Sequence, residues 1–496
     1  MKHSYTICPH CGCGCGLYLV RQDGSVGGVT ASLNHPFNQG QLCARGWTCH
    51  QLPNNPARIA APLVRSGESL TETTWDKALD FAANKLKTVR EAHGPESIGV
   101  IASPRLTTTE MFALRSLARD VLGTPHYDSG ARLVGYPFEF PKTAAMADLA
   151  TSDLIVVIGA NLLEDNPILG AKILSLCKPA ADRPYVSPDI AHVIPAAPIP
   201  LAVIGSRKST LGDIARPFIK PRPGSEPQLL AALLKSLIEN RHLTSGDSAF
   251  AKLKENLSKH SVNSLLDGAG VAAAQSLESL SAQLAKAKAP LLVIGRDLFQ
   301  TPGADTALAA LANLTLIFGD RLSVLPAATG ANEYAARRIL SSPDGMGYLE
   351  MIDALRRKKL HALVLAGEDP LRVLPGRDEV AQALGNAEYI LAIESFKSPL
   401  YAHAHAVLPL ALPMEKTGSF FTMDGIEQSF VAAVKPAGHS LPLDKILGGL
   451  TSRFQAKPAH DKTMSIGKVN AIDPMRSYEI PKTSDQIVLE LGSVYP

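Results

Sequence analysis

Three features of the sequence predict an α/β protein with mainly parallel sheets. Helical segments with one apolar face alternate with short apolar segments of strand length over most of the chain. The chain has 496 residues, which is too long for one compact core, so about two to four domains are expected. Hydrophobic residues make up 46% of the composition and charged residues 19%, a balance typical of globular folding.

The first series of alternating segments follows Thr74, which is the expected N-cap of a helix. That helix is predicted from Trp75 to about Arg90, because Leu79, Ala82, Leu86 and Val89 share one face. A strand, a helix and a strand are expected next, at Ser97–Ala102, Glu110–Leu122 and Leu154–Gly159.

A second series begins after a proline-rich stretch, Pro179–Pro227, which is predicted to be irregular. The expected elements of this later part are a helix at Pro227–Glu239, a strand at Pro290–Gly295, a helix near Asp305–Ala312, and strands at Ala362–Ala366 and Tyr389–Ala392. Parallel sheets usually bind ligands at the carboxyl ends of their strands, so candidate sites are sought there.

Charge and hydropathy exclude two classes of partner. The formal net charge is +3 and no basic run is present, so nucleic acid is not an expected partner. No stretch of about 18 apolar residues occurs, and the first residues lack a basic segment followed by an apolar one. The sequence therefore predicts a cytoplasmic protein without a direct membrane span.

The most informative segment is rich in cysteine. Cys8, Cys11 and Cys15 have the spacing C-x2-C-x3-C, and Cys43 follows in Gly40-Gln41-Leu42-Cys43-Ala44-Arg45-Gly46. Three clustered thiolates can bind one face of an iron–sulfur cubane, and a distant fourth can complete it. Gly12 and Gly14 would let backbone amides approach the sulfides. We therefore expect a 4Fe-4S cluster bound by these four cysteines.

Other interpretations of the cysteines stay open on spacing alone. C-x2-C with two further ligands also suits a structural zinc ion. Cys13 could replace Cys15, although the x3 spacing is then lost. Disulfides are disfavoured by the expected reducing compartment, and Cys49 and Cys177 are interpreted as ordinary buried thiols.

The segment from Tyr5 to Gly46 resembles the molybdopterin oxidoreductases, especially formate dehydrogenase large subunits and the large iron–sulfur subunit of NADH:quinone oxidoreductase. The family pattern is C-P-x-C-G-x-G-C-G-L followed by G-x-L-C-x-K-G, and this chain matches it nearly throughout. The resemblance favours the 4Fe-4S cluster over zinc. It departs at Arg45, where the family usually has a lysine between cluster and pterin.

Later segments extend the resemblance to about residue 450. Ile158-Gly159-Ala160-Asn161 is similar to a family segment that touches a pterin guanine dinucleotide, and the segments that begin at Pro223, Gly367 and Glu415 resemble P-G-T-D, G-E-N-P and E-K-x-G-T-F. The resemblance thus implies cofactor contacts for Arg45, Gly159, Asn161, Gly224 and Gly367. It implies a small N-terminal 4Fe-4S domain followed by two doubly wound, mainly parallel α/β domains.

The positions that carry molybdenum chemistry in the family differ in this chain. Ala131-Arg132-Leu133 is followed by Val134 and Gly135, where a formate dehydrogenase has cysteine or selenocysteine and then histidine. Valine cannot ligate molybdenum or tungsten, so no catalytic residue is predicted. The D-P-R segment reads Ser187-Pro188-Asp189, Ile426 replaces an arginine, and the expected arginine-rich segment is Ala327–Asn332. The family's C-terminal barrel has no counterpart in the expected tail.

Domain boundaries follow from these segments. The 4Fe-4S domain is expected at 1–58, joined by a return segment at about 401–450. A discontinuous α/β domain is expected at 59–134 and 288–400, an inserted α/β domain at 135–287, and a C-terminal tail at 451–496.

The sequence is compatible with three functions. The favoured hypothesis is an electron-transfer iron–sulfur subunit with a degenerate molybdenum site, working with other iron–sulfur or flavin subunits in a hetero-oligomer that could reach a membrane through those partners. The alternatives are a catalytic molybdenum or tungsten subunit, binding molybdopterin guanine dinucleotide and acting on formate or a formyl group with its closing domain on another chain, and a structural scaffold.

Overall fold

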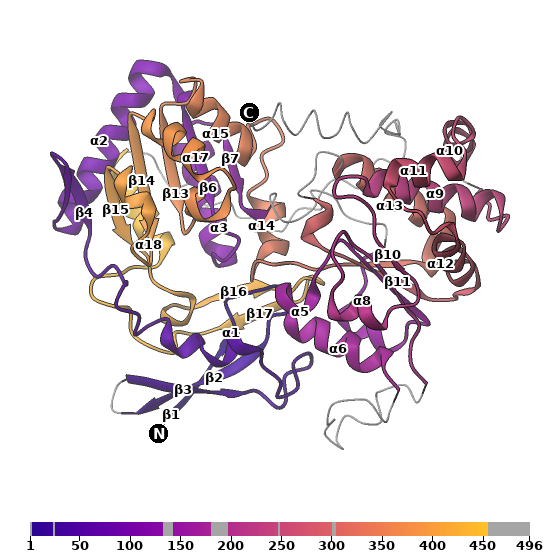
Figure 1. Cartoon of the computed structure of the whole chain (residues 1–496). Coiled ribbons are helices and arrows are strands. Elements are labelled where there is room, and N and C mark those ends of the chain that lie inside the picture. Colours follow the sequence, from indigo (N-terminus) through magenta and orange to yellow (C-terminus); the bar gives the residue numbers. More distant parts are fainter. Residues whose placement is uncertain are drawn as a thin grey trace. The chain divides into compact units, whose positions relative to one another are not determined.

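The computed structural model describes residues 2–22, 25–131, 142–179, 197–246, 249–299 and 304–454 (Figure 1). These residues belong to two compact units. Among the described residues, unit 1 combines residues up to 131 with residues 330–454, and unit 2 comprises residues 142–329. Each unit has its own sheet and its own core.

Unit 1 is built on a seven-stranded sheet in the order β5-β4-β15-β14-β13-β6-β7. Its strands are β4 (Leu63–Ser66), β5 (Ser69–Glu72), β6 (Ile98–Ala102), β7 (Tyr127–Ser129), β13 (Ala362–Ala366), β14 (Tyr389–Glu394) and β15 (Ala406–Pro409). The strands from β15 to β7 are parallel, and β4 and β5 are added antiparallel at one edge. Strands β6 and β13 are buried throughout, which explains why their sequences are unbroken apolar runs.

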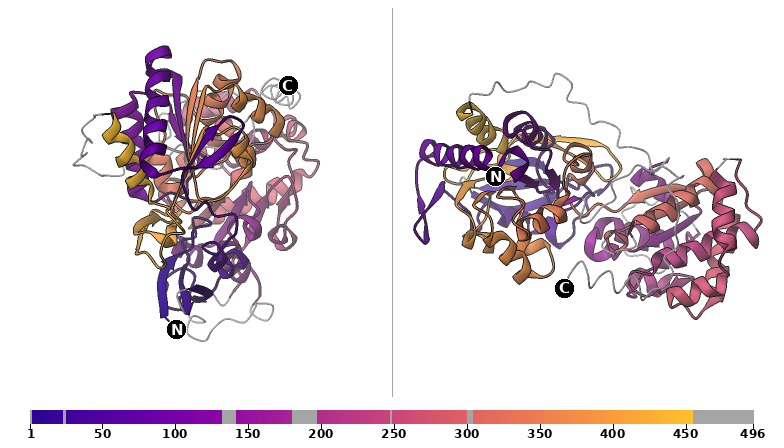
Figure 2. Two further views of the ribbon diagram at one scale, coloured as in Figure 1. Left: turned by 90° about the vertical axis from the view of Figure 1, so that its left-hand side faces the viewer. Right: turned by 90° about the horizontal axis from the view of Figure 1, so that it is seen from above.

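Helices cover both faces of this sheet (Figure 2). One face packs against α2 (Trp75–His93), α3 (Thr108–Ser116), α14 (Glu333–Ile339) and α18 (Leu443–Arg453), and the other against α15 (Tyr348–Arg356) and α17 (Arg377–Gly385). Successive residues of a strand alternate between the two cores: Val100 belongs to the first and Ile101 to the second. Two four-residue helices, α1 (Ala44–Trp47) and α16 (Pro370–Val373), complete the named helices of this unit's described part.

Unit 2 has a five-stranded parallel sheet in the order β10-β9-β8-β11-β12. Its strands are β8 (Leu154–Ile158), β9 (Leu201–Ile204), β10 (Phe218–Ile219), β11 (Pro290–Ile294) and β12 (Ser323–Pro326). Its helices are α5 (Leu162–Asp165), α6 (Pro167–Cys177), α8 (Thr210–Ile214), α9 (Glu226–Glu239), α10 (Ala249–Ser258), α11 (Val262–Ala269), α12 (Ala274–Lys286) and α13 (Ala304–Phe318). Helix α9 is buried along nearly its whole length and forms the centre of this core. Both units therefore have the doubly wound α/β fold that the sequence predicts.

Local patterns located several elements well. The predicted N-cap Thr74 accepts a hydrogen bond from the backbone N–H of Lys77, and α2 begins at Trp75 as expected. The prediction that Pro179–Pro227 is irregular is wrong for its described end, because β9, α8 and β10 lie between residues 201 and 219. These strands have only four and two residues, and so short an apolar run gives no periodic pattern.

The expected boundary at residue 288 is also wrong. Strand β11 pairs with β8, with Pro290 opposite Leu154, and β12 pairs with β11. Residues 288–329 therefore belong to unit 2 and not to the sheet of β13 and β14. Both sheets use buried parallel strands of the same composition, so the sequence does not reveal which sheet a strand joins. None of the described helices is long and apolar enough to cross a membrane.

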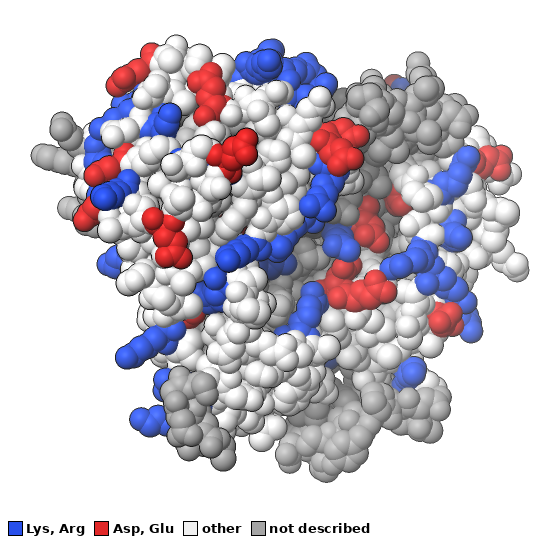
Figure 3. Space-filling model, turned by 60° about the vertical axis from the view of Figure 1, so that its left-hand side comes forward, with Lys and Arg blue, Asp and Glu red and all other residues white. Residues whose placement is uncertain are grey.

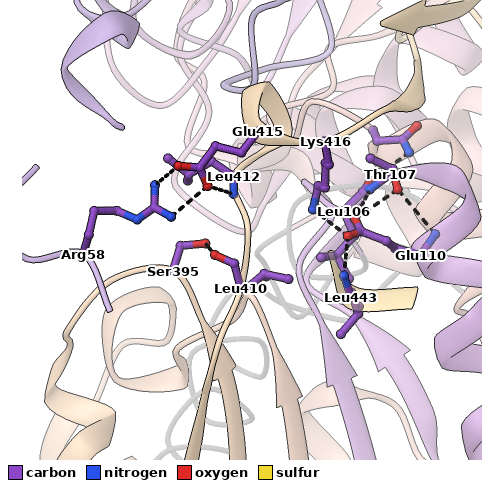
Figure 4. Close-up of polar contacts among 11 residues, drawn as sticks. Arg58, Leu106, Thr107, Glu110, Ser395, Leu410, Leu412, Glu415, Lys416 and Leu443 are labelled. Carbon is purple, nitrogen blue, oxygen red and sulfur yellow. Dashed lines mark hydrogen bonds and ion pairs between the residues drawn. The ribbon is translucent and has the colours of Figure 1, made fainter. Parts of the chain in front are cut away.

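Two buried ion pairs lie on consecutive residues of unit 1 (Figure 4). The Arg58 guanidinium donates two hydrogen bonds to the Glu415 carboxylate, at 2.7 and 2.8 Å. Lys416 Nζ lies 2.6 Å from Glu110 Oε1. All four side chains are at most 5% exposed, so each charge depends on its partner for stabilisation.

We predict that Glu415→Gln lowers the free energy of unfolding of unit 1 by about 3 kcal/mol, because Arg58 is left buried without an opposite charge. Both tryptophans, Trp47 and Trp75, lie in unit 1, so their fluorescence during urea unfolding measures this unit. The control is Asp353→Asn on α15, which weakens exposed pairings with Arg356 and Arg357 and should cost less than about 1 kcal/mol. Equal effects of the two variants would contradict the prediction.

Candidate metal centre

A small antiparallel sheet places the first three cysteines of the motif. It consists of β1 (Lys2–Ile7), β2 (Gly16–Gln22) and β3 (Ser25–Ala31). Cys8 directly follows β1 and Cys15 directly precedes β2, and the backbone N–H of Cys8 donates to Cys15 O at 2.9 Å. The loop between these strands is therefore closed at its base. Cys8, Cys11 and Cys15 are 5–7% exposed, so the three thiols are together in a dry loop.

Asn38 connects this loop to the fourth cysteine. Its buried side-chain amide accepts from the N–H of Gly16 and donates to Gly16 O and to Gln41 O, at 2.9–3.2 Å. Gly16 follows Cys15 and Gln41 lies two residues before Cys43, so one side chain joins both parts of the motif. Cys43 is the N-cap residue of α1 and is only partly buried.

The electrostatics of the thiols fit a positively charged metal group. Burial raises the pKa of the Cys8 thiol well above its ordinary value, and the nearby Cys15, Cys11 and Cys49 raise it further. Thiolates this close repel one another, and bound metal ions offset that repulsion. No disulfide joins any of the seven cysteines, all of which lie in the described residues. The donor set therefore fits a thiolate-bound cluster.

Cys49 lies closer to this site than its interpretation as an ordinary thiol suggested. It is buried, and burial together with the nearby Cys43 raises the pKa of its thiol to about 12. It also contributes to the raised pKa of Cys8. Cys13 is 1% exposed and belongs to the same loop, whereas Cys177 lies at the end of α6 in unit 2.

Arg45 lies beside the cysteine loop. It is half-buried on α1, and its charge acts on His10. Burial lowers the pKa of His10 to about 4, with a further contribution from the charges of Arg45 and Arg105. His10 is therefore neutral at physiological pH, and the nearby positive charge is that of arginine.

A hairpin from the far end of unit 1 covers the loop. It consists of β16 (Gly418–Phe421) and β17 (Glu427–Phe430), and its Met423 N–H donates to Gly12 O at 2.8 Å. Gly14 has a φ of +59°, and a side chain there would lie 2.6 Å from Gln428 Oε1. Gly14 N–H donates to Cys11 O, so this amide serves the turn of the loop. Gly12 and Gly14 thus allow the loop to turn and the hairpin to approach.

Cysteine-to-serine variants distinguish the candidate ligands. We predict that Cys15→Ser and Cys43→Ser lose most of the bound iron and the visible absorption of the cluster, because serine is a poor ligand for a thiolate-bound cluster. Cys13→Ser and the distant control Cys177→Ser should keep about four irons per chain. Iron retained in Cys15→Ser but lost in Cys13→Ser would assign the ligand to Cys13, and zinc in place of iron would contradict the cluster.

The second candidate region is the carboxyl edge of the seven-stranded sheet, where Gly367 lies directly after β13. Glu368 follows it, and Glu394 ends the neighbouring strand β14. Burial raises the pKa of Glu368 to about 7 and that of Glu394 to about 8, and the neighbouring carboxylates add to both shifts. Several buried polar atoms at this edge have no hydrogen-bond partner: Glu394 Oε1, Asp369 Oδ2 and Ser129 Oγ. The sequence analysis recognised the segment that begins at Gly367 but not that its acids lie near Glu394, because strand ends meet only in the folded sheet.

The carboxyl edge of the five-stranded sheet carries Gly159 and Asn161. Gly159 has a φ of +60°, and a side chain there would lie 2.8 Å from the backbone nitrogen of Leu298. Asn161 is the N-cap residue of α5 but makes no side-chain cap hydrogen bond. Gly224 precedes Ser225, the N-cap residue of α9 in the same unit.

Charged side chains at this second edge do not suit a pyrophosphate. Glu164 lies 3.1 Å from Arg207, and Arg296 lies 3.2 Å from Asp165, so these cations already face carboxylates. Burial raises the pKa of Glu226 at the start of α9, and Asp297 raises it further. Both edges thus carry buried acids among their described residues, and burial raises the pKa values of Glu226, Glu368 and Glu394, which favours their protonated forms and supplies no positive charge for a pyrophosphate.

Some of the positions at which this chain differs from the family's molybdenum and pterin segments lie outside the described residues, namely Arg132–Gly135 and Ser187–Asp189. Two other such positions lie in the described residues. Ile426 is 55% exposed on the hairpin. Asn332 is buried, donates to Leu106 O and accepts from Phe421 N–H, so this residue has a structural role.

The buried glutamates predict a pH effect on stability. Unfolded Glu ionises near pH 4.3, whereas folded Glu368 and Glu394 keep their protons to about pH 7 and about pH 8. Between these values the folded state binds more protons, so stability falls as pH rises, by up to about 1.4 kcal/mol per pH unit for each group. We predict that Glu394→Gln and Glu368→Gln each reduce this slope, measured by urea unfolding at pH 5, 6.5 and 8. Unchanged slopes in both variants would contradict the assignment.

Two doubly wound units combined with a cysteine loop suited to an iron–sulfur cluster are typical of one class of oxidoreductase. Comparison with models of known protein families gives the same class. The Molybdopterin oxidoreductase Fe4S4 domain matches residues 1–55, and the Molybdopterin oxidoreductase domain matches residues 58–453. Since these matches cover most of the chain, the chain belongs to the molybdopterin oxidoreductase family. The resemblance predicted from the cysteine motif is confirmed, as is the predicted combination of an Fe4S4 domain with a pterin-type fold.

Named relatives are similar over most of this chain. The F420-dependent formate dehydrogenase subunit alpha of Methanocaldococcus jannaschii is 28% identical over 88% of this chain and 68% of its own length. The NADPH-Fe(3+) oxidoreductase subunit alpha of Geobacter sulfurreducens is 25% identical over 95% of this chain and 58% of its own length. The structure of acetylene hydratase from Pelobacter acetylenicus has a TM-score of 0.74 at 18% identity, over 91% of this chain and 69% of that one. The chain thus spans about half to two thirds of its relatives.

Proposed function

We propose that this chain is an electron-transfer iron–sulfur subunit of a larger redox complex, with Cys8, Cys11, Cys15 and Cys43 as cluster ligands. The observation that carries the proposal is the contrast between the sites. The cysteine loop is dry, rich in thiols and fixed by Asn38, whereas both sheet edges that could hold a pterin carry buried acids.

When bound, a 4Fe-4S cluster supplies one-electron exchange. The chain's own residues set the conditions for it. The buried thiols exclude water, and the Arg45 charge favours the more negative, reduced state, which raises the reduction potential. Cys43 is the most exposed of the four ligands, so electrons would enter or leave on its side.

We further propose that the cluster domain comprises residues 1–58 with the return segment at about 401–450. Ile7 on β1 packs with Phe420 and Phe430 of the hairpin in one small core, which supports this grouping. The tail at 451–496 lies almost wholly outside the described residues.

Partner subunits follow from the chemistry of a single cluster, which needs a donor and an acceptor. Two named relatives are alpha subunits of oxidoreductases, which supports a hetero-oligomer with other iron–sulfur or flavin subunits. We propose a cytoplasmic location, with any association to a membrane provided by those partners.

A second candidate function is favoured by the family itself. Relatives are named formate dehydrogenases, so a catalytic molybdenum or tungsten subunit, closed over its pterins by another chain, is the alternative. A scaffold subunit is the remaining candidate. Its cluster would not be reversibly reduced at the reduction potentials of the partner subunits, whereas the cluster of an electron carrier would be.

Metal analysis of the native, anaerobically purified complex tests the proposal. We expect about four irons per chain, no stoichiometric molybdenum or tungsten, and a cluster that dithionite reduces and air reoxidises. A stoichiometric amount of either heavy metal would establish the catalytic alternative. A cluster that cannot be reduced would leave only the scaffold.

A further inference from the structure

Two histidines and a glutamate meet at the amino edge of the seven-stranded sheet, the edge opposite to Gly367 and Glu394. His93 is the last residue of α2, His361 directly precedes β13, and Glu388 directly precedes β14. Glu388 Oε1 lies 3.0 Å from His93 Nε2 and 2.8 Å from His361 Nδ1. Three atoms that can bind a metal ion are therefore together at a place far along the strands from the acidic edge.

The backbone that carries these side chains is fixed by the sheet. His361 N–H donates to Ser97 O, and His361 O accepts from Glu388 N–H, each at 2.8 Å. The N–H and the hydroxyl of Ser97 both donate to Gly94 O, at 3.2 and 2.6 Å. Gly94 directly follows His93 and ends α2. The three side chains thus start from backbone whose relative positions are set by short hydrogen bonds within unit 1.

An exposed carboxylate is by itself no sign of a metal site. Figure 3 shows acidic side chains at several places among basic ones, so exposed acids are common on this protein. Glu388 differs because two imidazoles approach the same oxygen atom. Histidine is the commonest metal ligand, and two histidines with one glutamate form a known ligand set for zinc, with water as the fourth ligand.

The spacing suits a tetrahedral ion once the rings have turned. Two ligand atoms on a tetrahedral zinc lie about 3.3 Å apart, slightly more than the distances from Glu388 Oε1 to the two imidazoles. The rings are stacked, with centroids 3.7 Å apart and 6° between their planes. A shared ion must lie near both ring planes, so at least one ring must rotate about its Cβ–Cγ bond, a torsion with a broad minimum. The side chains of His93 and His361 are 32% and 23% exposed, which leaves room for this rotation and for a water molecule.

We propose that His93, His361 and Glu388 bind one zinc ion, with water as the fourth ligand. The ion takes the place of the ring protons that face Glu388, and those protons are released to solvent. It links the end of α2 to the starts of β13 and β14 and thereby stabilises unit 1. None of the three ligands belongs to the cysteine loop, so zinc binding here is independent of the proposed electron transfer.

The test uses the full chain carrying its cluster, prepared without oxygen. Zinc sulfate is titrated by calorimetry in the presence of excess magnesium, which prefers oxygen ligands and should not compete. The visible absorption of the cluster is followed throughout to establish that zinc does not displace iron. Urea unfolding of unit 1 is then followed by tryptophan fluorescence with and without zinc.

Wild type should bind one zinc ion at this site, and zinc should raise its urea midpoint. His93→Gln and Glu388→Gln should each weaken zinc binding by more than about 100-fold, because the loss of second-shell partners alone costs about 10- to 100-fold. Both side chains are partly exposed, so without zinc the two variants should unfold close to the wild-type midpoint. The matched control is His439→Gln, which removes an exposed imidazole of unit 1 outside this group and should bind zinc as wild type does.

Three results would overturn the zinc site. The first is the absence of zinc binding by wild type in excess magnesium. The second is equal zinc affinity of wild type, His93→Gln and Glu388→Gln, which would mean an adventitious ion only and a hydrogen-bonded surface group. The third is zinc binding that leaves the wild-type urea midpoint unchanged. If one variant unfolds without zinc, the other variant decides. Reduction of the cluster enters none of these measurements, so failure here leaves the proposed function standing.

Discussion

The geometry of unit 1 depends on the paired burial of charges at Glu415 and Lys416. Each carboxylate in these pairs also accepts backbone N–H groups: Glu415 from Leu412, and Glu110 from Thr107 and Leu443. An unpaired charge would be too costly at such burial, so the segments that supply the four charges have one stable relative arrangement. The pairs thereby fix the return segment just before it forms the hairpin over the cysteine loop.

The conformation of the cysteine loop likewise depends on a few specific contacts. Its base is closed by Cys8 and Cys15, its rim is covered by the hairpin at Gly12 and Gly14, and its distant fourth thiol is positioned through Asn38. None of these contacts requires a metal ion. The loop can thus hold its thiols close together before metal binds, which lowers the entropy cost of assembling the ligand set.

Sequence spacing predicted those features of the structure that depend on residues close together in the chain. The C-x2-C-x3-C pattern and the N-cap of α2 depend on neighbours within a few residues, so they could be recognised directly. The Arg58–Glu415 pair joins residues 357 positions apart, and β11 joins β8 through a register that only the folded sheet defines. Asn38 looked like any loop residue, because its role depends on where Gly16 and Gln41 meet. The cluster of Glu368, Glu394 and Asp369 was missed for the same reason.

The glycines that match the family pattern carry less functional information than the match itself suggests. Gly159 is required by the backbone itself, since any side chain would collide with the Leu298 nitrogen whether or not a cofactor is present. A match at such a position therefore reports the fold. Ligand binding is reported by the side chains around the turn. Here Arg207 and Arg296 pair with Glu164 and Asp165, and burial raises the pKa values of Asp297 and Glu226. A fold can thus keep a turn of a dinucleotide-binding sheet for reasons of backbone geometry alone, whereas a cofactor site also needs donor side chains, which the cysteine loop supplies among the described residues.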